Sequence, residues 1–246
     1  NRTTHGVINL EQKDDICTLT MDAGENRWNT TFVRAFAAAL ETVEGSSGPA
    51  ALVTRSADEK FFSNGLDLDW YRAPDDHPAG GDVGVFAAEF MALMGRIITM
   101  PIPTICAVNG HGFGAGFMLA LCHDVRLMRS DRGFLCASEM LLGMVIPKPE
   151  LALFRHKLPA HVFYETVQLA RRWAGPQALA AGIVEQITER DDLLAAANQR
   201  AVELAPLGAN REAFAAQKES LFGANASINS TDGAAHLLKN YAGRDH

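Results

Sequence analysis

The sequence predicts an α/β core followed by a helical C-terminal region, and three observations support this prediction. Short apolar runs alternate with amphipathic helical patterns over most of the chain. A glycine-rich stretch, residues 109–116, separates a strand-like run from a buried helical one. Beyond residue 149 the patterns are almost entirely helical. Repeated strand–strand–helix units followed by helices alone are typical of an α/β core with a helical extension.

In the first half of the chain, apolar and β-branched runs predict strands, and apolar stripes at helical spacing predict helices. The expected strands cover residues 6–12, 16–21, 50–55, 61–63, 104–108, 125–128 and 134–137. The expected helices cover residues 31–44, 85–100 and 117–122. Residues 73–84, rich in Pro, Gly and Asp, are expected to form a loop.

The second half is predicted to be mainly helical, with one strand-like run at 183–187. The expected helices cover residues 149–158, 161–172, 176–181, 191–205 and 209–222. The core should therefore span residues 1–190, and the helical region 191–246. A stripe in the helical region exceeds what a short extension needs for itself, which predicts a subunit interface. The stripe consists of Leu193, Leu194, Ala197, Ala201 and Leu204.

Length and composition exclude several classes of protein. With 246 residues, 48% of them hydrophobic, the chain can bury a large core. A net charge of −7 argues against a nucleic-acid-binding surface, and no apolar run is long enough to cross a membrane. The four cysteines lack C-x-x-C spacing, so we expect reduced core residues and no metal site. Without a signal-peptide pattern a cytoplasmic location is expected, with a peroxisomal one left open.

Four glycines, at positions 110, 112, 114 and 116, organise the chain. A strand, a glycine-rich turn and a helix aim backbone N–H groups at a ligand, because glycine has no Cβ to block a close approach. Two other interpretations of this stretch are a tight buried connection and a dinucleotide site, since Gly110 to Ala115 fits G-x-G-x-x-G/A. The short helix and the position in mid-chain both weaken the dinucleotide interpretation.

Three motifs follow one another along the chain. They are FFSNGLDL at 61–68, AVNGHGFGAG at 107–116, and FLCASEMLLG at 134–143, with Ile146-Pro147 just after. Together they resemble the crotonase (enoyl-CoA hydratase/isomerase) superfamily over about residues 6–190. They are most similar to the delta-3,delta-2-enoyl-CoA isomerases of the plant and peroxisomal type. The resemblance implies a crotonase-like spiral of strand–strand–helix units. It also implies a C-terminal trimerisation region, and hence a homotrimer or a dimer of trimers.

The resemblance also implies the catalytic groups. In the family, the residue after the glycine of the first motif and the middle residue of the glycine triplet donate N–H groups to an acyl-CoA thioester oxygen. Here these residues are Leu66 and Ala115. Hydratases carry two glutamates, and this chain has Glu139 at one position and Met118 at the other. One base beside an oxyanion hole suits the transfer of a proton between C2 and C4, which favours a 3-enoyl-CoA isomerase. Coenzyme A enters as part of the substrate, and no cofactor is expected.

Neighbouring motif residues are candidates for substrate binding. They are Ser63, Asn64, Gly65, Asp67, Leu68, Gly114 and Met118, with Lys60 as a possible contact for a CoA phosphate. Trp70, Phe86, Phe90 and Leu93 suit either an acyl tunnel or an ordinary core. Glu150 is a further carboxylate whose direction the sequence leaves open, and its replacement by glutamine is expected to leave most activity intact.

Two alternatives to isomerisation stay open. The first is another crotonase reaction, hydration or thioester hydrolysis, with the water held by Glu139 alone. The second is a CoA-binding homologue with little turnover, in which the methionine at position 118 marks lost catalysis.

Overall fold

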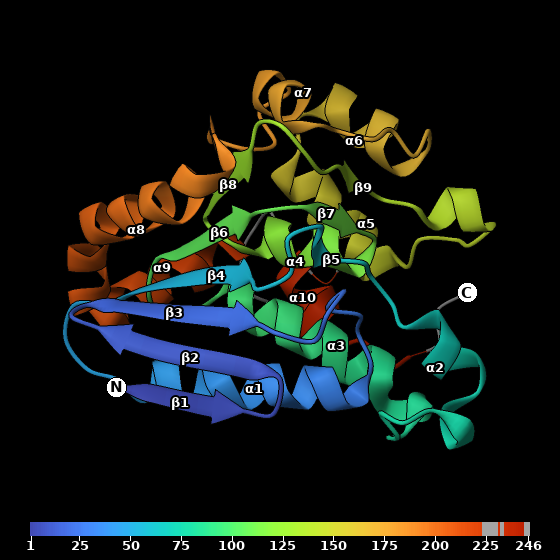
Figure 1. Ribbon diagram of the computed structural model, residues 1–246, viewed down its shortest axis with the longest axis horizontal. Helices are drawn as coiled ribbons and strands as arrows, with labels where there is room; N and C mark the ends of the chain where they lie inside the picture. The colour runs from blue at the N-terminus through green and yellow to red at the C-terminus, as the bar shows by residue number, and fades with distance from the viewer. Residues whose placement is uncertain (223–230, 232–233, 244–246) are drawn as a thin grey trace.

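Two sheets carry the fold in the computed structural model, which describes residues 1–222, 231 and 234–243 (Figure 1). Within these residues, seven strands form the main sheet in the order β1-β2-β3-β4-β6-β8-β10, and three form a second sheet in the order β5-β7-β9. The pairs β1–β2 and β2–β3 are antiparallel, and every pair from β3 to β10 is parallel. The second sheet is parallel throughout.

The bounds of the strands are β1 Arg2–His5, β2 Ile8–Lys13, β3 Ile16–Met21, β4 Ala51–Ser56, β5 Phe61–Ser63, β6 Thr104–Val108, β7 His111–Phe113, β8 Val125–Arg129, β9 Leu135–Cys136 and β10 Gln186–Thr188. The α-helices are α1 Thr30–Glu44, α2 Leu68–Arg72, α3 Val83–Ile98, α4 Ala115–Cys122, α5 Lys148–Lys157, α6 Ala160–Val167, α7 Gly175–Ala180, α8 Leu193–Leu204, α9 Arg211–Phe222 and α10 Ala234–Lys239. Short 3-10 turns are η1 Pro74–Asp76, η2 Glu139–Leu142, η3 Arg190–Asp192 and η4 Ala205–Ala209. No helix in the described part of the chain is long and apolar enough to cross a membrane.

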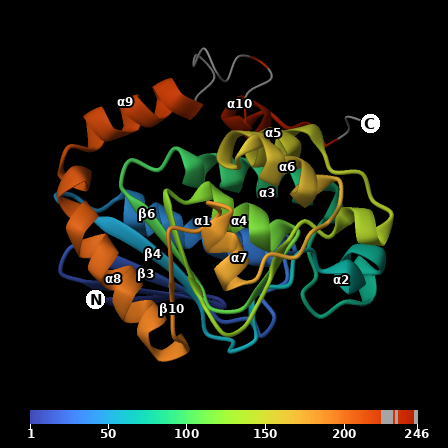
Figure 2. The same cartoon turned by 90° about the horizontal axis from the view of Figure 1, so that it is seen from above.

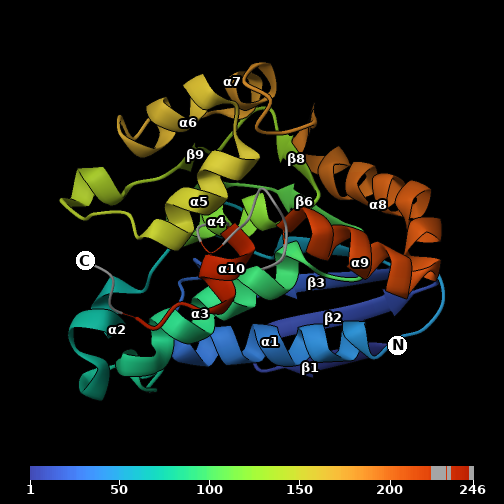
Figure 3. The same cartoon turned by 180° about the vertical axis from the view of Figure 1, so that it is seen from behind.

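Different helices cover the two faces of the main sheet (Figures 2 and 3). On one face, α8 packs across β4, β6 and β8, where Val53, Ile105 and Leu127 belong to its buried cluster. On the other face, α1, α3 and α4 enclose the larger core, and α10 packs on α3 and α5. The second sheet and the N-terminus of α4 lie at one end of this arrangement, where the three motifs meet.

The apolar stripe of α8 lies against the sheet of its own chain. Leu193, Ala197 and Ala201 are at most 2% exposed and pack on the β4–β6–β8 face. The expectation that these three residues bury a subunit interface is therefore wrong, because their own sheet presents the apolar surface that they cover. The homotrimer or dimer of trimers stays a prediction. Residues 223–230, 232–233 and 244–246 of the predicted oligomerisation region lie outside the described residues.

Most predicted elements are present, and tertiary contacts explain the differences. The helix expected over 161–172 ends at Val167, because Ala170 has a φ of +48° and Trp173 pairs with Leu135 of β9. The glycine-rich stretch contains β7, which pairs with β5 and β9. The helix α2 was not predicted. It begins where the Asp67 side chain accepts a hydrogen bond from the Trp70 N–H.

Candidate active site

The first turn of the candidate site joins β5 to α2. Gly65 has a φ of +79°, and a Cβ built there would lie 2.7 Å from the Phe113 carbonyl oxygen, so only glycine fits against β7. The turn is held by two backbone bonds, from the Trp28 N–H to Gly65 O (2.8 Å) and from the Asp67 N–H to Trp28 O (2.9 Å). Between them, the Leu66 N–H has no acceptor within the described residues. It is therefore available to a ligand.

The second turn joins β7 to α4. Gly114 has a φ of +49°, and its N–H donates to Cys136 O (2.9 Å), which ties the turn to β9. Ala115 is the first residue of α4, and its N–H finds no acceptor in the part of the chain described. The two turns meet, since a Cβ on Gly65 would lie 3.8 Å from the Ala115 nitrogen. Two free donors on adjoining turns, one at a helix N-terminus, are suited to stabilising an oxyanion.

Glu139 opens η2, separated from the end of β9 by two residues, and its carboxylate faces the second turn. A Cβ built on Gly114 would lie 3.0 Å from Glu139 Oε1. The side chain is half-buried, and this burial raises the pKa of Glu139 above its usual value. Its Oε2 atom is buried without a hydrogen-bond partner among the described residues. A partly desolvated carboxylate beside oxyanion donors is suited to general-base catalysis.

A second carboxyl group lies beside the first. Glu150, in the first turn of α5, is only 5% exposed, and burial raises its pKa well above the usual value. Glu150 and Glu139 lie close enough to interact, and after burial this interaction lowers the pKa of Glu139 and raises that of Glu150. The sequence left the direction of this side chain open, because it depends on how α5 packs on α4. The Phe117 and Phe154 rings make that contact, edge to face, at 5.1 Å.

A cavity of about 350 Å³ opens beside the two turns. Its walls include Leu66 and Ser138, the neighbour of Glu139, together with Arg27, Arg72 and Arg172. Arg27 is held in ion pairs, whereas Arg72 and Arg172 have no carboxylate partner in the described parts of the chain. Larger hollows of about 370, 470 and 500 Å³ lie elsewhere, and neither Leu66 nor Ser138 lines any of them. Sequence analysis missed the three arginines, since nothing distinguishes them from ordinary surface residues.

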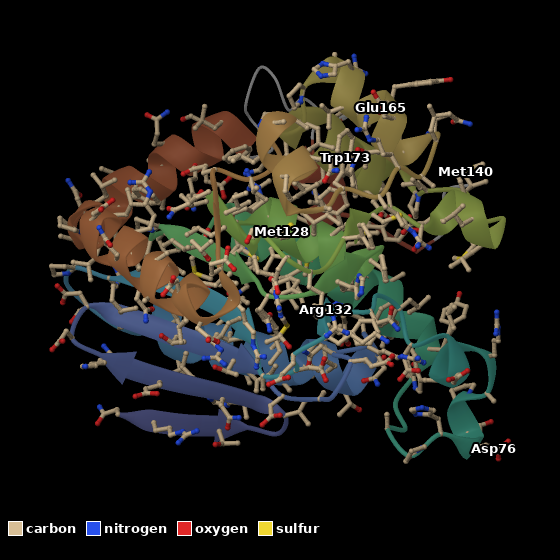
Figure 4. The ribbon with its side chains drawn as sticks, turned by 45° about the horizontal axis from the view of Figure 1, so that its top comes forward. Asp76, Met128, Arg132, Met140, Glu165 and Trp173 are labelled. Carbon is tan, nitrogen blue, oxygen red and sulfur yellow. The ribbon has the colours of Figure 1, made fainter. Side chains whose placement is uncertain are left out.

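An apolar segment borders the same cavity. Leu141 and Leu142 line it, and the run from Met140 to Val145 has several strongly exposed side chains, with Val145 at 88%. Figure 4 shows Met140 on the η2 segment, at the edge of the molecule. This exposed segment, residues 140–145, follows Glu139 directly in the chain.

Three of the predicted substrate-binding residues support the first turn from within the protein. Ser63 is fully buried, where it accepts a hydrogen bond from Trp28 Nε1 (3.0 Å) and donates one to Asn26 O (2.8 Å). Asp67 is 5% exposed and caps α2. Asn64 lines the cavity and donates to Glu25 (2.8 Å). Of the three, only Asn64 is in the cavity wall.

The remaining predicted residues are spread more widely. Leu68 lines the cavity, and Met118 is 1% exposed within the larger core. Lys60 is exposed, with its ammonium 4.9 Å from the centre of the Phe61 ring. The aromatic residues considered for an acyl tunnel pack together in the core, with the rings of Trp70 and Phe86 5.4 Å apart.

These motifs and this fold have close counterparts among known proteins. The family described as enoyl-CoA hydratase/isomerase matches residues 11–240. The chain belongs to this family. An Arabidopsis thaliana relative named enoyl-CoA delta isomerase 2, peroxisomal, is 30% identical over 88% of this chain and 92% of its own length.

Two further similar proteins extend the comparison. A carnitinyl-CoA dehydratase of Escherichia coli is 35% identical over 69% of this chain and 61% of its own length. The crystal structure of a probable enoyl-CoA hydratase, EchA3, from Mycobacterium tuberculosis superposes with a TM-score of 0.78 at 25% identity. That alignment covers 96% of this chain and 92% of the mycobacterial one.

Proposed function

We propose that this member of the enoyl-CoA hydratase/isomerase family moves a double bond, converting 3-enoyl-CoA to trans-2-enoyl-CoA. The Leu66 and Ala115 N–H groups bind the thioester oxygen. Glu139 takes the proton from C2, and the electrons of the broken C–H bond form a dienolate whose charge rests on that oxygen. Glu139 then returns the proton to C4, the double bond forms between C2 and C3, and the thioester carbonyl is restored.

One observation carries this proposal. The Glu139 carboxylate lies against the glycine turn that presents Ala115, while the position where hydratases keep their other glutamate holds the buried Met118. A single base that accepts and returns one proton is sufficient for isomerisation, whereas hydration also needs a water to be held and deprotonated. The relative named as an isomerase also aligns over more of the chain than the one named as a dehydratase.

The cavity walls suit the two ends of an acyl-CoA. Arg72 and Arg172 carry guanidinium groups without carboxylate partners among the described residues, and such groups bind phosphates well. The exposed apolar segment 140–145, whose Leu141 and Leu142 line the same cavity, offers a surface for the acyl chain. Lys60 does not line this cavity and is a weaker candidate for the phosphates than the sequence suggested.

Hydration is the competing function, because Glu150 supplies a second carboxyl group beside Glu139. The experiment offers the purified protein 3-enoyl-CoA and, separately, trans-2-enoyl-CoA. Product formation is followed by the absorbance of the conjugated thioester and by chromatography of 3-hydroxyacyl-CoA. We expect double-bond migration to exceed hydration by at least about a hundredfold, the contribution of one missing acid–base group. Comparable rates of both reactions would overturn the isomerase proposal, and no turnover of either substrate would favour a CoA-binding homologue.

A further inference from the structure

Glu150 is the least solvated carboxyl group near the candidate site. It is 5% exposed, and its Oε1 atom has no hydrogen-bond partner among the residues described. A buried carboxylate that lacks both a cation and a donor is strongly destabilised, so the group is expected to keep its proton or to share one. Glu139 Oε2 is the other unpartnered buried carboxyl oxygen of this region.

The two carboxyl groups can satisfy each other only through a proton. Ionised carboxylates are acceptors alone, so a hydrogen bond between Glu139 and Glu150 forms only when one of them is protonated. Glu150 is the more deeply buried of the two and has its pKa raised further, whereas Glu139 is half-buried beside the cavity. The proton therefore belongs mainly to Glu150, and the negative charge to Glu139.

We propose that Glu150 is a positioning residue: as a neutral acid it donates a hydrogen bond to Glu139 Oε2, which directs Oε1 at the Gly114–Ala115 turn. This inference rests on the proposed function, because it assigns Glu139 the role of base. The donated bond keeps Glu139 ionised in a desolvated place and holds one rotamer of its side chain. The other oxygen stays free to take a proton from the substrate.

One titratable group on the neighbouring strand β9 responds to this pair: after burial, Glu139 helps to raise the pKa of the Cys136 thiol. The titratable side chains on the helices packed against α5 are Cys122 of α4, those of α6 (His161, Tyr164 and Glu165), and those of α10 (His236 and Lys239). On α5 itself they are Lys148, Arg155, His156 and Lys157. None of them contributes to the shifted pKa of Glu139 or of Glu150, which depend on burial, on each other and on the Glu139 backbone. The pKa of Glu139 is thus set first by burial and then by its own backbone N–H, and Glu150 is the one side chain that contributes to it.

Two variants of Glu150 distinguish the effect of its side-chain shape from the effect of its proton. Glu150→Gln keeps a neutral donor, so the isomerase should retain its rate at neutral pH within a few-fold but lose the fall at alkaline pH that ionisation of Glu150 causes. Glu150→Leu removes the donor and leaves Glu139 desolvated, which raises its pKa. The acid limb of the pH–rate profile should then move upward, and the rate at neutral pH should fall about tenfold or more. Glu212→Gln, an exposed first-turn glutamate of α9, is the matched control and should change nothing.

A second readout does not require the proposed reaction. Because the folded-state pKa of Glu150 is raised above its ordinary value of 4.5, the stability that its protonated form contributes is lost as pH rises through the folded-state pKa. In thermal unfolding, Glu150→Gln and the wild type should therefore be equally stable in acid. The stability of Glu150→Gln relative to that of the wild type should increase as pH rises. If the wild type is not an isomerase but shows this pattern, the proposed function fails and the shared proton stands. If both Glu150 variants share the pH profile and pH-dependent stability of the wild type, the inference is overturned.

Discussion

The two halves of the candidate site are built on different principles. The half proposed to hold the thioester oxygen consists of main chain: Gly65 and Gly114, both with positive φ, position the N–H groups of Leu66 and Ala115. The half proposed to move the proton depends on side chains: Glu139, on a 3-10 turn, is the proposed base, and Glu150, on α5, is proposed to position it. The first half depends on backbone conformation and tolerates many side chains. The second depends on side-chain identity and on where a single proton resides.

The largest effect is expected from removing the base. Glu139→Gln keeps the size and the hydrogen-bonding capacity of the side chain but cannot accept and return a proton. We predict a kcat for isomerisation lower by about 10²–10⁴-fold, the usual range for a positioned acid–base group. Binding of a saturated acyl-CoA, measured by calorimetry, should change little because the oxyanion donors are main chain. A variant with near-wild-type turnover would place the base elsewhere.

The next largest effect should come from the backbone half. Gly65→Ala adds a Cβ 2.7 Å from the Phe113 carbonyl oxygen, so the turn must move and the Leu66 N–H moves with it. We predict a loss of about 10²–10³-fold in kcat, the effect of losing one oxyanion donor.

Gly48→Ala is the matched control for this prediction. Its φ of +78° equals that of Gly65 within a degree, but a Cβ there meets nothing within 4 Å. Left-handed strain should cost both variants about 1–2 kcal/mol of stability. The backbone contact at Gly65 should cost Gly65→Ala more stability than this, and only Gly65→Ala should lose activity. Equal kinetics in the two variants would show that the turn carries no donor.

A smaller effect on kinetics is expected from the cavity wall that is proposed to bind the CoA phosphates. Arg172→Ala removes a cation whose guanidinium lies about 6 Å from the centres of the Phe113 and Phe134 rings and which lines the cavity. We predict a KM for acyl-CoA raised roughly 3- to 30-fold with kcat unchanged, as expected from one charge-assisted hydrogen bond to phosphate. Lys60→Ala should raise KM less, and the opposite order would restore Lys60 as the phosphate contact.

The smallest effect concerns the far end of α4, the helix that begins at Ala115. His123 is fully buried, accepts a hydrogen bond from the Thr54 hydroxyl (2.8 Å) and donates one to Leu119 O (2.7 Å). Burial lowers the pKa of His123 to about 4 from its ordinary 6.5. As pH falls, the unfolded chain therefore binds a proton on His123 at a higher pH than the folded chain does. The contribution of neutral His123 to stability is complete above pH 6.5 and is lost as pH falls toward 4. His123→Gln should be less stable at neutral pH, but its urea midpoint should vary less across that window.

The backbone half could be predicted from the sequence because its glycines mark the conformations it needs. Gly65 and Gly114 stand at fixed places in recognisable motifs, and the donors are simply the next residues. Glu139 could be placed by the same motif register. Glu150 could not, since the direction of a first-turn helical residue depends on packing between α4 and α5. The α8 stripe shows a related limit: periodicity predicts that Leu193 and Ala197 are buried, but not which surface buries them.

The ion pair between Lys218 and Asp124 has a consequence for where the chain can be cut. Lys218 of α9 is 4% exposed and donates to Asp124 Oδ2 (2.9 Å) and to Ile102 O (3.3 Å). The same carboxylate oxygen accepts from the Thr104 N–H at the start of β6 (2.9 Å). A truncation at residue 190 would remove Lys218 from this carboxylate and expose the sheet face beneath α8. The candidate site lies entirely before residue 190. A fragment that lacks the last helices should nevertheless be degraded by proteases rather than act as an enzyme.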